Sequence, residues 1–287
     1  MASMRDIKRR KSSIESTQQI TKDMKLVSTV KLQRAKGRAE DSKEYFNSIY
    51  STVNSILGKC KNIEHRYLKP GAVGKKAVIL ITANRGLAGG YNSNVLKLIL
   101  LDERFNKDNT VVYAVGKKGR DSMKRAGYPI ANDYSEVIEE PIFKDALEIS
   151  ADVLESFEKG EISEIYLAYT FFKNTVSHIP TLLKLLPVEV DEAKLAETEE
   201  DRAPMNFEPH EEEAIDMLVP KYITSIIYGA LVEAVASENG ARMQAMDSAT
   251  NNATEMIDHL SLLYNRARQG SITQELTEII AGADAIS

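Results

Sequence analysis

The stretch AVILITANRGLAGGYNSNVL, residues 77–96, joins an apolar run, a turn with three glycines and the start of an amphipathic segment. The apolar run through Thr82 is typical of a buried β-strand, and the segment from Tyr91 onward is typical of a helix. A strand, a glycine-rich turn and a helix form the layout of a dinucleotide-binding site. The stretch is therefore a candidate phosphate-binding loop.

The spacing of the glycines favours a plain turn instead. Gly86, Gly89 and Gly90 follow the pattern G-x-x-G-G, which matches neither the dinucleotide fingerprint nor the P-loop. Lys117 and Lys118 stand at the end of the next apolar run, where a ribose-binding acid would be expected. We therefore expect a tight strand-to-helix turn without a bound cofactor, and an enzyme with a helical dimerisation arm remains the alternative.

Around this stretch, short apolar runs alternate with amphipathic segments. Strands are expected at 76–82, 110–115, 164–172 and 176–188, and helices at 91–105, 118–125 and 143–157. This alternation predicts a small, mostly parallel open sheet, to which the last hairpin adds an antiparallel edge. The segment 69–76 is expected to be a linker, and the acidic segment 190–204 a loop or a disordered connection.

Both ends of the chain predict very long helices. Between Met4 and Leu57 there is no proline and only one glycine, which predicts a helix of ~80 Å ending near Gly58. After Pro209 a second helix of ~100 Å is expected, which Pro220 either kinks or begins. The expected contact positions are Ile7, Ile14, Ile20, Met24, Val27, Phe46, Ile49, Val53 and Ile56, facing Met246, Ala249, Ala253, Met256, Leu260, Leu263 and Ala267. Helices of this length need each other, so we expect a parallel or antiparallel coiled coil.

Composition excludes several classes of protein. The 287 residues are 43% hydrophobic, and no apolar run reaches the ~20 residues of a membrane span. The N-terminus lacks the apolar core of a secretory signal. A single cysteine, Cys60, cannot form an internal disulfide, and four scattered histidines offer neither a metal cluster nor a nucleophile–base pair. No catalytic, cofactor-binding or metal-binding residue is therefore expected.

The N-terminal helix is strongly basic. Residues 1–43 hold twelve Lys or Arg and five Asp or Glu, a balance of 12 − 5 = +7, although the whole chain carries −5. This excess indicates an acidic partner. Nucleic acid is disfavoured because the first 44 residues contain no aromatic side chain for stacking. An acidic protein loop and a merely solvated face both remain open.

The C-terminal ITQELTEIIAGADA, residues 272–285, resembles the signature of the gamma subunit of F-type ATP synthases. The matching positions are Ile272, Thr273, Glu275, Glu278, Gly282, Ala283 and Ala285. Segments 5–35, 81–94, 228–253 and 264–279 also look like that family. The resemblance therefore covers both ends of the chain and its centre.

The resemblance implies an α/β fold in which helices 1–58 and 209–287 form a long antiparallel coiled coil. Residues 75–190 would form a Rossmann-like, mostly parallel foot domain. Such a chain is a rotor shaft that couples ion flow through the membrane c-ring to ATP synthesis in a ring of alpha and beta subunits, and that regulates its ATPase activity. It has no substrate or cofactor of its own, binds no nucleic acid and contacts the epsilon subunit. Without a transit peptide or a cysteine-bearing insertion, it would lie at the cytoplasmic face of a bacterial cell membrane.

Motif matches assign residues to these contacts. Those expected to face the alpha and beta ring are Met24, Lys25, Arg242, Arg268, Gln269, Thr273, Glu275 and Glu278. Those expected in the foot, toward epsilon and the c-ring, are Arg85, Gly86, Gly89, Gly90, Asn92 and Phe207, the last from the MNFEP motif at 205–209. Guanidinium groups such as Arg242 and Arg268 can bind carboxylates through two hydrogen bonds at once.

Overall fold

The computed structural model describes residues 4–59, 65–68, 74–188 and 211–284. These residues form two compact units. One unit joins the chain up to Ser28 with the chain from Arg242 onward, and the other spans Thr29–Ala241. Two long helices, α1 (Met4–Lys59) and α6 (Glu211–Asp284), contribute to both units.

The larger unit contains a five-stranded sheet in the order β3-β2-β1-β4-β5. Its strands are β1 (Lys75–Ile81), β2 (Thr110–Val115), β3 (Ile130–Asp133), β4 (Ile162–Phe172) and β5 (His178–Leu186). The first four strands are parallel, and β5 is antiparallel to β4. The predicted mostly parallel sheet with an antiparallel edge is confirmed. Strand β3 was not predicted, because its sequence IAND is short and its residues are mostly exposed.

Helices cover both faces of this sheet. On one face, α2 (Tyr91–Leu100) and α3 (Lys117–Arg125) pack on Val78, Leu80, Val112 and Ala114. On the other face, α4 (Phe143–Glu158) and the first half of α6 pack on Ile79, Ile81, Ile165 and Leu167. A short 3-10 helix, η1 (Val137–Glu139), precedes α4. The helix predicted at 91–105 ends at Leu100, so residues 101–105 belong to the following loop.

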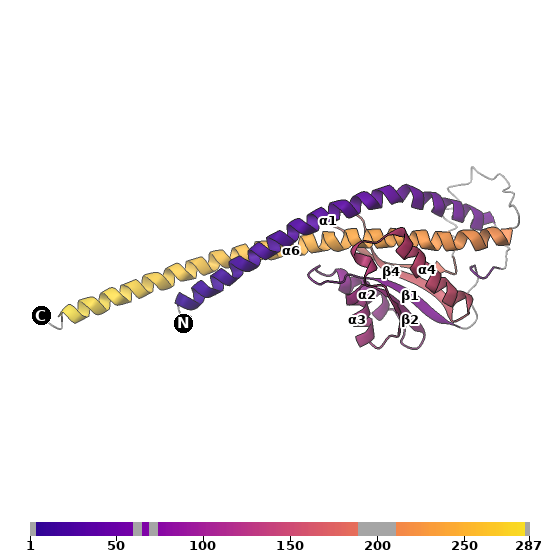
Figure 1. Ribbon diagram of the computed structural model, residues 1–287. Helices are drawn as coiled ribbons and strands as arrows, with labels where there is room; N and C mark the ends of the chain where they lie inside the picture. Colours follow the sequence, from indigo (N-terminus) through magenta and orange to yellow (C-terminus); the bar gives the residue numbers. More distant parts are fainter. Residues whose placement is uncertain (1–3, 60–64, 69–73, 189–210, 285–287) are drawn as a thin grey trace. The chain divides into compact units, whose positions relative to one another are not determined.

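In the smaller unit, α1 and α6 run side by side in opposite directions (Figure 1). Three side-chain pairs fix the register: Gln18 with Thr254, Thr21 with Thr250, and Lys25 with Asp247. The number on α6 falls as the number on α1 rises, so the pair is antiparallel. The coiled coil predicted from the length of the helices is confirmed, in the orientation that the family resemblance implies.

Most of the predicted contact positions are confirmed, but Ile20 and Val27 on α1 are wrong by one residue. The predicted contacts of Phe46, Ile49, Val53 and Ile56 lie outside the described side chains. On α1 the inward positions include Ile7, Ile14, Thr21 and Ser28, whereas Ile20 and Val27 are 58% and 57% exposed. On α6, Met246, Ala253, Leu260 and Ala267 face inward as predicted, but Met256 and Leu263 are exposed. The prediction followed hydrophobicity, and the seam on α1 is partly polar because its polar side chains find hydrogen-bond partners on α6.

Helix α6 begins at Glu211 and contains Pro220, so this proline does not mark the start of the helix. The hydroxyl of Thr224 donates to the carbonyl oxygen of Pro220 at 2.9 Å. By length and composition α6 could cross a membrane, but most of its apolar window is buried inside the fold. Packing against the sheet therefore accounts for its apolar sequence.

Candidate functional site

The carboxyl end of β1 is where a sheet of this order would bind a nucleotide, because the strand order reverses between β1 and β4. On one side of this crevice, the segments that follow β1 and β2 approach closely. A Cβ on Gly116, whose φ is +115°, would lie 2.0 Å from the carbonyl oxygen of Thr82. The backbones that follow these two strands are therefore in direct contact.

The amides at the start of α3, which could otherwise cradle a phosphate, are bonded to the chain itself. Lys117 donates to Oδ1 of Asn84 at 3.0 Å, and Lys118 donates to the carbonyl oxygen of Ala83 at 3.1 Å. Gly119 donates to Oγ1 of Thr82 at 2.8 Å. The three residues that follow β1 thus accept hydrogen bonds from the first three amides of α3. Such amides are the groups that bind anions at helix N-termini.

Helix α6 covers the same edge of the sheet. The Tyr91 hydroxyl donates to the carbonyl oxygen of Ala234 at 3.2 Å, and the Ser237 hydroxyl donates to that of Thr170 at 3.0 Å. Ala241 packs against a small apolar cluster that includes Ala83. The crevice is a docking place for α6, and this accounts for the strand–turn–helix pattern without a nucleotide.

The glycine turn is tight, as its sequence predicts. Of the three glycines in this turn, only Gly89 lies in the left-handed region, with φ of +56°. Leu87 also adopts this conformation, with φ of +62°, although it has a side chain. Arg85 is exposed. Asn92 accepts a hydrogen bond from the amide of Ala83 at 2.8 Å, so it holds the turn in place.

The other glycines of the predicted foot contacts have ordinary backbone angles. Gly90 precedes α2 with φ of −83°, and Gly86 has open space where a Cβ would lie. Phe207, the remaining residue of that prediction, lies outside the described residues.

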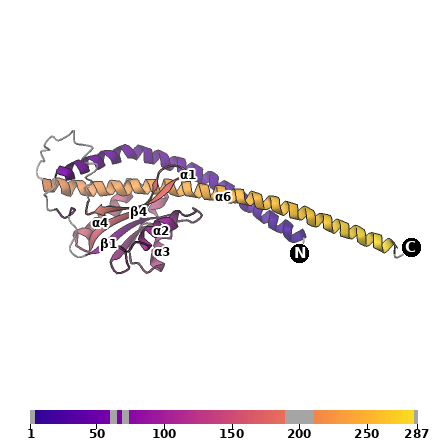
Figure 2. The same cartoon turned by 180° about the vertical axis from the view of Figure 1, so that it is seen from behind.

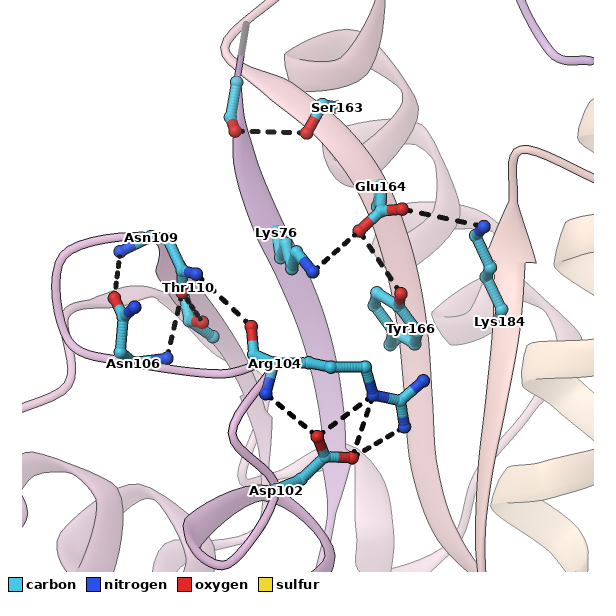
Figure 3. A network of polar contacts seen from close by, with 11 residues as sticks. Lys76, Asp102, Arg104, Asn106, Asn109, Thr110, Ser163, Glu164, Tyr166 and Lys184 are labelled. Atoms are coloured by element: carbon cyan, nitrogen blue, oxygen red, sulfur yellow. Dashed lines mark hydrogen bonds and ion pairs between the residues drawn. The ribbon is translucent and has the colours of Figure 1, made fainter. Parts of the chain in front are cut away.

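A polar network lies at the opposite, amino end of the sheet (Figure 3). Glu164 on β4 lies between Lys76 on β1 at 3.1 Å and Lys184 on β5 at 3.6 Å, and it accepts from the Tyr166 hydroxyl at 3.2 Å. Burial by itself raises the pKa of Glu164. The hydrogen bond and charge of Lys76, together with Lys184 and Tyr166, lower it by more, so the pKa is below its usual value. The network therefore joins three neighbouring strands through one ionised carboxylate.

Arg104 extends this network over the sheet. Its guanidinium donates to both carboxylate oxygens of Asp102, and it lies 5.8 Å from the ring centre of Tyr166 (Figure 3). The hydrogen bonds from Arg104 lower the pKa of Asp102.

Two predicted ring contacts, Met24 and Lys25, lie on the middle of the coiled coil. Lys25 Nζ is 2.6 Å from Oδ1 of Asp247, and both side chains are half exposed. Met24 is half-buried beside it. The positive charge of Lys25 is therefore balanced within the helical pair.

The remaining predicted ring contacts lie on α6. Arg268, Gln269, Thr273, Glu275 and Glu278 are exposed and follow one another along the last turns of the helix. The Thr273 hydroxyl donates to the carbonyl oxygen of Gln269 at 2.9 Å, and Glu278 accepts from Gln274 at 2.9 Å. Arg242 lies far from them along the helix, at the start of the smaller unit.

Sequence reasoning missed an apolar row on this last segment of α6. In each paired contact of the coiled coil, the residue numbers on α1 and α6 add up to about 272. The same register places Met4 of α1 opposite residue 268 of α6. Helix α6 extends beyond the first described residue of α1 (Figures 1 and 2). There it exposes Ile272, Leu276, Ile279 and Ile280, at 49%, 54%, 68% and 61%. Their spacing of four, three and one was visible in the sequence as a helical stripe.

Several titratable groups with shifted pKa values take part in packing contacts of the larger unit. Burial and a hydrogen bond to Glu158 raise the pKa of Tyr67, and burial and a bond to Asp152 raise that of Tyr134. Burial lowers the pKa of His178. No group of three metal-ligating side chains occurs among the residues that the structure describes.

Comparison with known proteins gives one consistent result. The family model for ATP synthase matches residues 3–286. The ATP synthase gamma chain of Lachnoclostridium phytofermentans is 64% identical to this chain over 292 residues, and the match covers 100% of both chains. The central stalk and c-ring structure of Tetrahymena thermophila mitochondrial ATP synthase contains a chain 26% identical to this one, with a TM-score of 0.60, covering 80% of this chain and 99% of that chain. A chain of the Euglena gracilis mitochondrial ATP synthase has the same fold, with a TM-score of 0.67 at 19% identity over 99% of this chain and 94% of its own.

A long antiparallel helical pair and a sheet whose ligand crevice is filled from within define a stalk-type subunit of a larger assembly. The chain belongs to the family of ATP synthase gamma chains. It is a rotor subunit of an F-type ATP synthase.

Proposed function

We propose that this chain transmits rotation between an ion-driven c-ring and a catalytic ring of alpha and beta subunits. In this proposal it couples ion flow to ATP synthesis and regulates ATP hydrolysis, but catalyses no reaction itself. Segments 1–58 and 209–287 act as the shaft, and segment 75–190 acts as the foot that meets epsilon and the c-ring. The assembly lies at the cytoplasmic face of a bacterial cell membrane.

The observation that carries this proposal is the exposed apolar row of α6. Ile272, Leu276, Ile279 and Ile280 lie beyond the described start of α1 and have no covering element in the described chain. An apolar stripe that continues past its coiled-coil partner needs another apolar surface around it. A surrounding ring supplies such a surface on every side of the helix.

The exposed polar residues of the same segment add specificity. Arg268, Gln269, Thr273, Glu275 and Glu278 present charges and amides beside the apolar row. Charged groups at the rim of a contact determine orientation more than affinity. We therefore assign the apolar row to holding the shaft and these polar residues to the contacts that change as it turns.

The filled crevice supports a mechanical role for the foot. Asn84, Thr82 and Ala83 accept from the first amides of α3, and Glu164 ties three strands together at the other end of the sheet. A sheet whose strands are joined by such contacts is suited to carrying load. Arg85 on the exposed turn remains our candidate for a foot contact, with Phe207 in the MNFEP motif.

Reconstitution tests the proposal directly. Alpha–beta rings are joined to a c-ring in sealed vesicles with and without the chain, and ATP synthesis driven by an imposed ion gradient is measured. We expect ion-driven ATP synthesis only with the chain, and no ATPase activity from the chain alone. Rings that couple equally well without the chain, or hydrolysis by the isolated chain, would refute the proposal.

A further inference from the structure

Between Gln18 and Ser28, helix α1 is turned with polar residues inward and apolar residues outward. Thr21 and Ser28 are buried against α6, whereas Ile20, Leu26 and Val27 are exposed. Burial of apolar surface by itself favours the opposite arrangement. Something other than hydrophobic packing therefore sets the rotation of α1 in this segment.

A rotation of α1 by one residue, about 100°, would exchange the two faces. Ile20 and Val27 would then replace Thr21 and Ser28 in the seam. The sequence carries both possibilities, because each set of positions repeats at a spacing of seven. Upstream, Ile14 faces inward in the observed rotation, whereas the alternative would place Ser13 there.

Three polar pairs join α1 to α6 in the observed rotation. Gln18 Nε2 donates to Oγ1 of Thr254 at 2.7 Å, and the hydroxyls of Thr21 and Thr250 are 2.8 Å apart. Lys25 Nζ binds Asp247 at 2.6 Å. Each pair lies one step further along the seam, so a turn of α1 breaks all three together.

The polar groups on α6 are also bonded to their own helix. The Thr254 hydroxyl donates to the carbonyl oxygen of Thr250 at 3.0 Å, and the Thr250 hydroxyl donates to that of Met246 at 2.8 Å. The Thr21 hydroxyl likewise lies 2.9 Å from the carbonyl oxygen of Gln18 in its own helix, and either hydroxyl of the Thr21–Thr250 pair can donate to the other. These local bonds hold the paired hydroxyl oxygens at the seam.

We propose that Gln18–Thr254, Thr21–Thr250 and Lys25–Asp247 are positioning pairs that lock the rotation of α1. Their role is to keep Ile20, Leu26 and Val27 on the outer surface of the shaft, where hydrophobic packing alone would draw them inward. Polar groups in a seam are known to select one arrangement of a coiled coil at the expense of stability, and here Thr21 is the buried member of the three pairs. The proposal concerns the chain itself and does not depend on its partners in the rotor.

The test replaces the α6 side of all three pairs in the full chain, as Asp247→Ala, Thr250→Ala and Thr254→Ala. Alanine keeps helix propensity high, so α6 remains helical. In a Cys60→Ser background, one reporter cysteine is added at a time, either Val27→Cys or Ser28→Cys, and its reaction rate with a water-soluble thiol reagent is measured. We expect the Val27→Cys rate to fall and the Ser28→Cys rate to rise, each by about tenfold, as the two faces exchange populations.

The matched control is the triple variant Ser248→Ala, Asn251→Ala and Asn252→Ala, which alters exposed positions of the same turns. It should leave both rates as they are in the parent chain. Two results would overturn the proposal. Unchanged rates in the first variant would show that the pairs do not set the rotation, and a rise at both reporters would show that they only hold the helices together.

Discussion

A side chain on Gly116 would have to begin 2.0 Å from the carbonyl oxygen of Thr82. This contact brings the ends of β1 and β2 together at the edge where related sheets bind nucleotides. Thr82 then reaches the amide of Gly119 in α3. The contact therefore closes the ligand crevice and anchors a helix at the same time.

We predict that Gly116→Ala destabilises the larger unit by more than ~3 kcal/mol, because a Cβ there meets backbone and the φ of +115° is strained for any side chain. Urea denaturation of the full chain, followed by the near-UV circular dichroism of its tyrosines, measures the change. The coiled coil should keep its far-UV signal at urea concentrations that unfold the sheet.

Gly86→Ala is the matched control in the neighbouring turn. A Cβ at Gly86 meets nothing within 4 Å, and its φ is not in the left-handed region. Its effect should be within about 0.5 kcal/mol. Equal losses in the two variants would show that the Thr82 contact has no special role.

The Glu164 network predicts a dependence of stability on pH. Because the pKa of Glu164 in the folded chain is below its usual value of 4.5, its ionised form stabilises the fold at neutral pH. This contribution is present above pH 4.5 and is lost as the pH falls through the lower folded pKa. We expect Glu164→Gln to cost about 1–3 kcal/mol at pH 7 and much less at pH 3.

Urea titrations of both proteins at pH 7 and pH 3 measure this difference. Glu155→Gln is the control, because Glu155 forms an exposed pair with Lys159 one turn along α4. Such exposed pairs contribute little to stability, so Glu155→Gln should have a small effect at both pH values. A Glu164→Gln effect that is the same at both pH values would contradict the assignment of an ionised carboxylate.

The fold was largely predictable from the sequence because its signals are local. The strands around Val78 and Val112 appear as apolar runs, and the helices at both ends appear as long segments almost free of proline and glycine. Strand β3 was missed because Ile130 is its only large apolar residue, so nothing in IAND repeats with a period of two. Its position depends on pairing with β2, which is a tertiary effect.

The candidate surfaces were less predictable, since they depend on which face of a helix is covered. Hydrophobicity placed Ile20 and Val27 in the seam, yet Thr21 and Ser28 occupy it. The choice is made by partners more than two hundred residues away in sequence, such as Thr250 for Thr21. The hydrophobic pattern of one helix does not indicate such a distant partner.

Gly240 gives a third prediction, within the first half of α6. A Cβ there would lie 2.4 Å from Nε2 of His178 on the hairpin of β4 and β5. We expect Gly240→Ala to destabilise the larger unit by about 1–3 kcal/mol through overpacking. The double variant Gly240→Ala, His178→Ala should recover part of this loss, measured against His178→Ala alone.

Gly270 on the same helix serves as the control, because a Cβ there meets nothing within 4 Å. Gly270→Ala should raise helix stability by roughly 0.5–1 kcal/mol. If Gly240→Ala also stabilises the chain, the contact with His178 leaves enough space for a methyl group and the argument fails.

The exposed row at the end of α6 gives the last prediction, which concerns assembly. Leu276→Ala and Ile279→Ala together should weaken association with the alpha–beta ring by at least about tenfold, since covering two such side chains is worth a few kcal/mol. The isolated chain should keep its melting temperature, because both side chains are exposed in it. Asn265→Ala, an exposed position of α6 outside this row and outside the predicted polar contacts, should change neither quantity. Surface plasmon resonance with an immobilised ring measures the affinity, and an unchanged affinity in the double variant would mean that the ring does not cover this row.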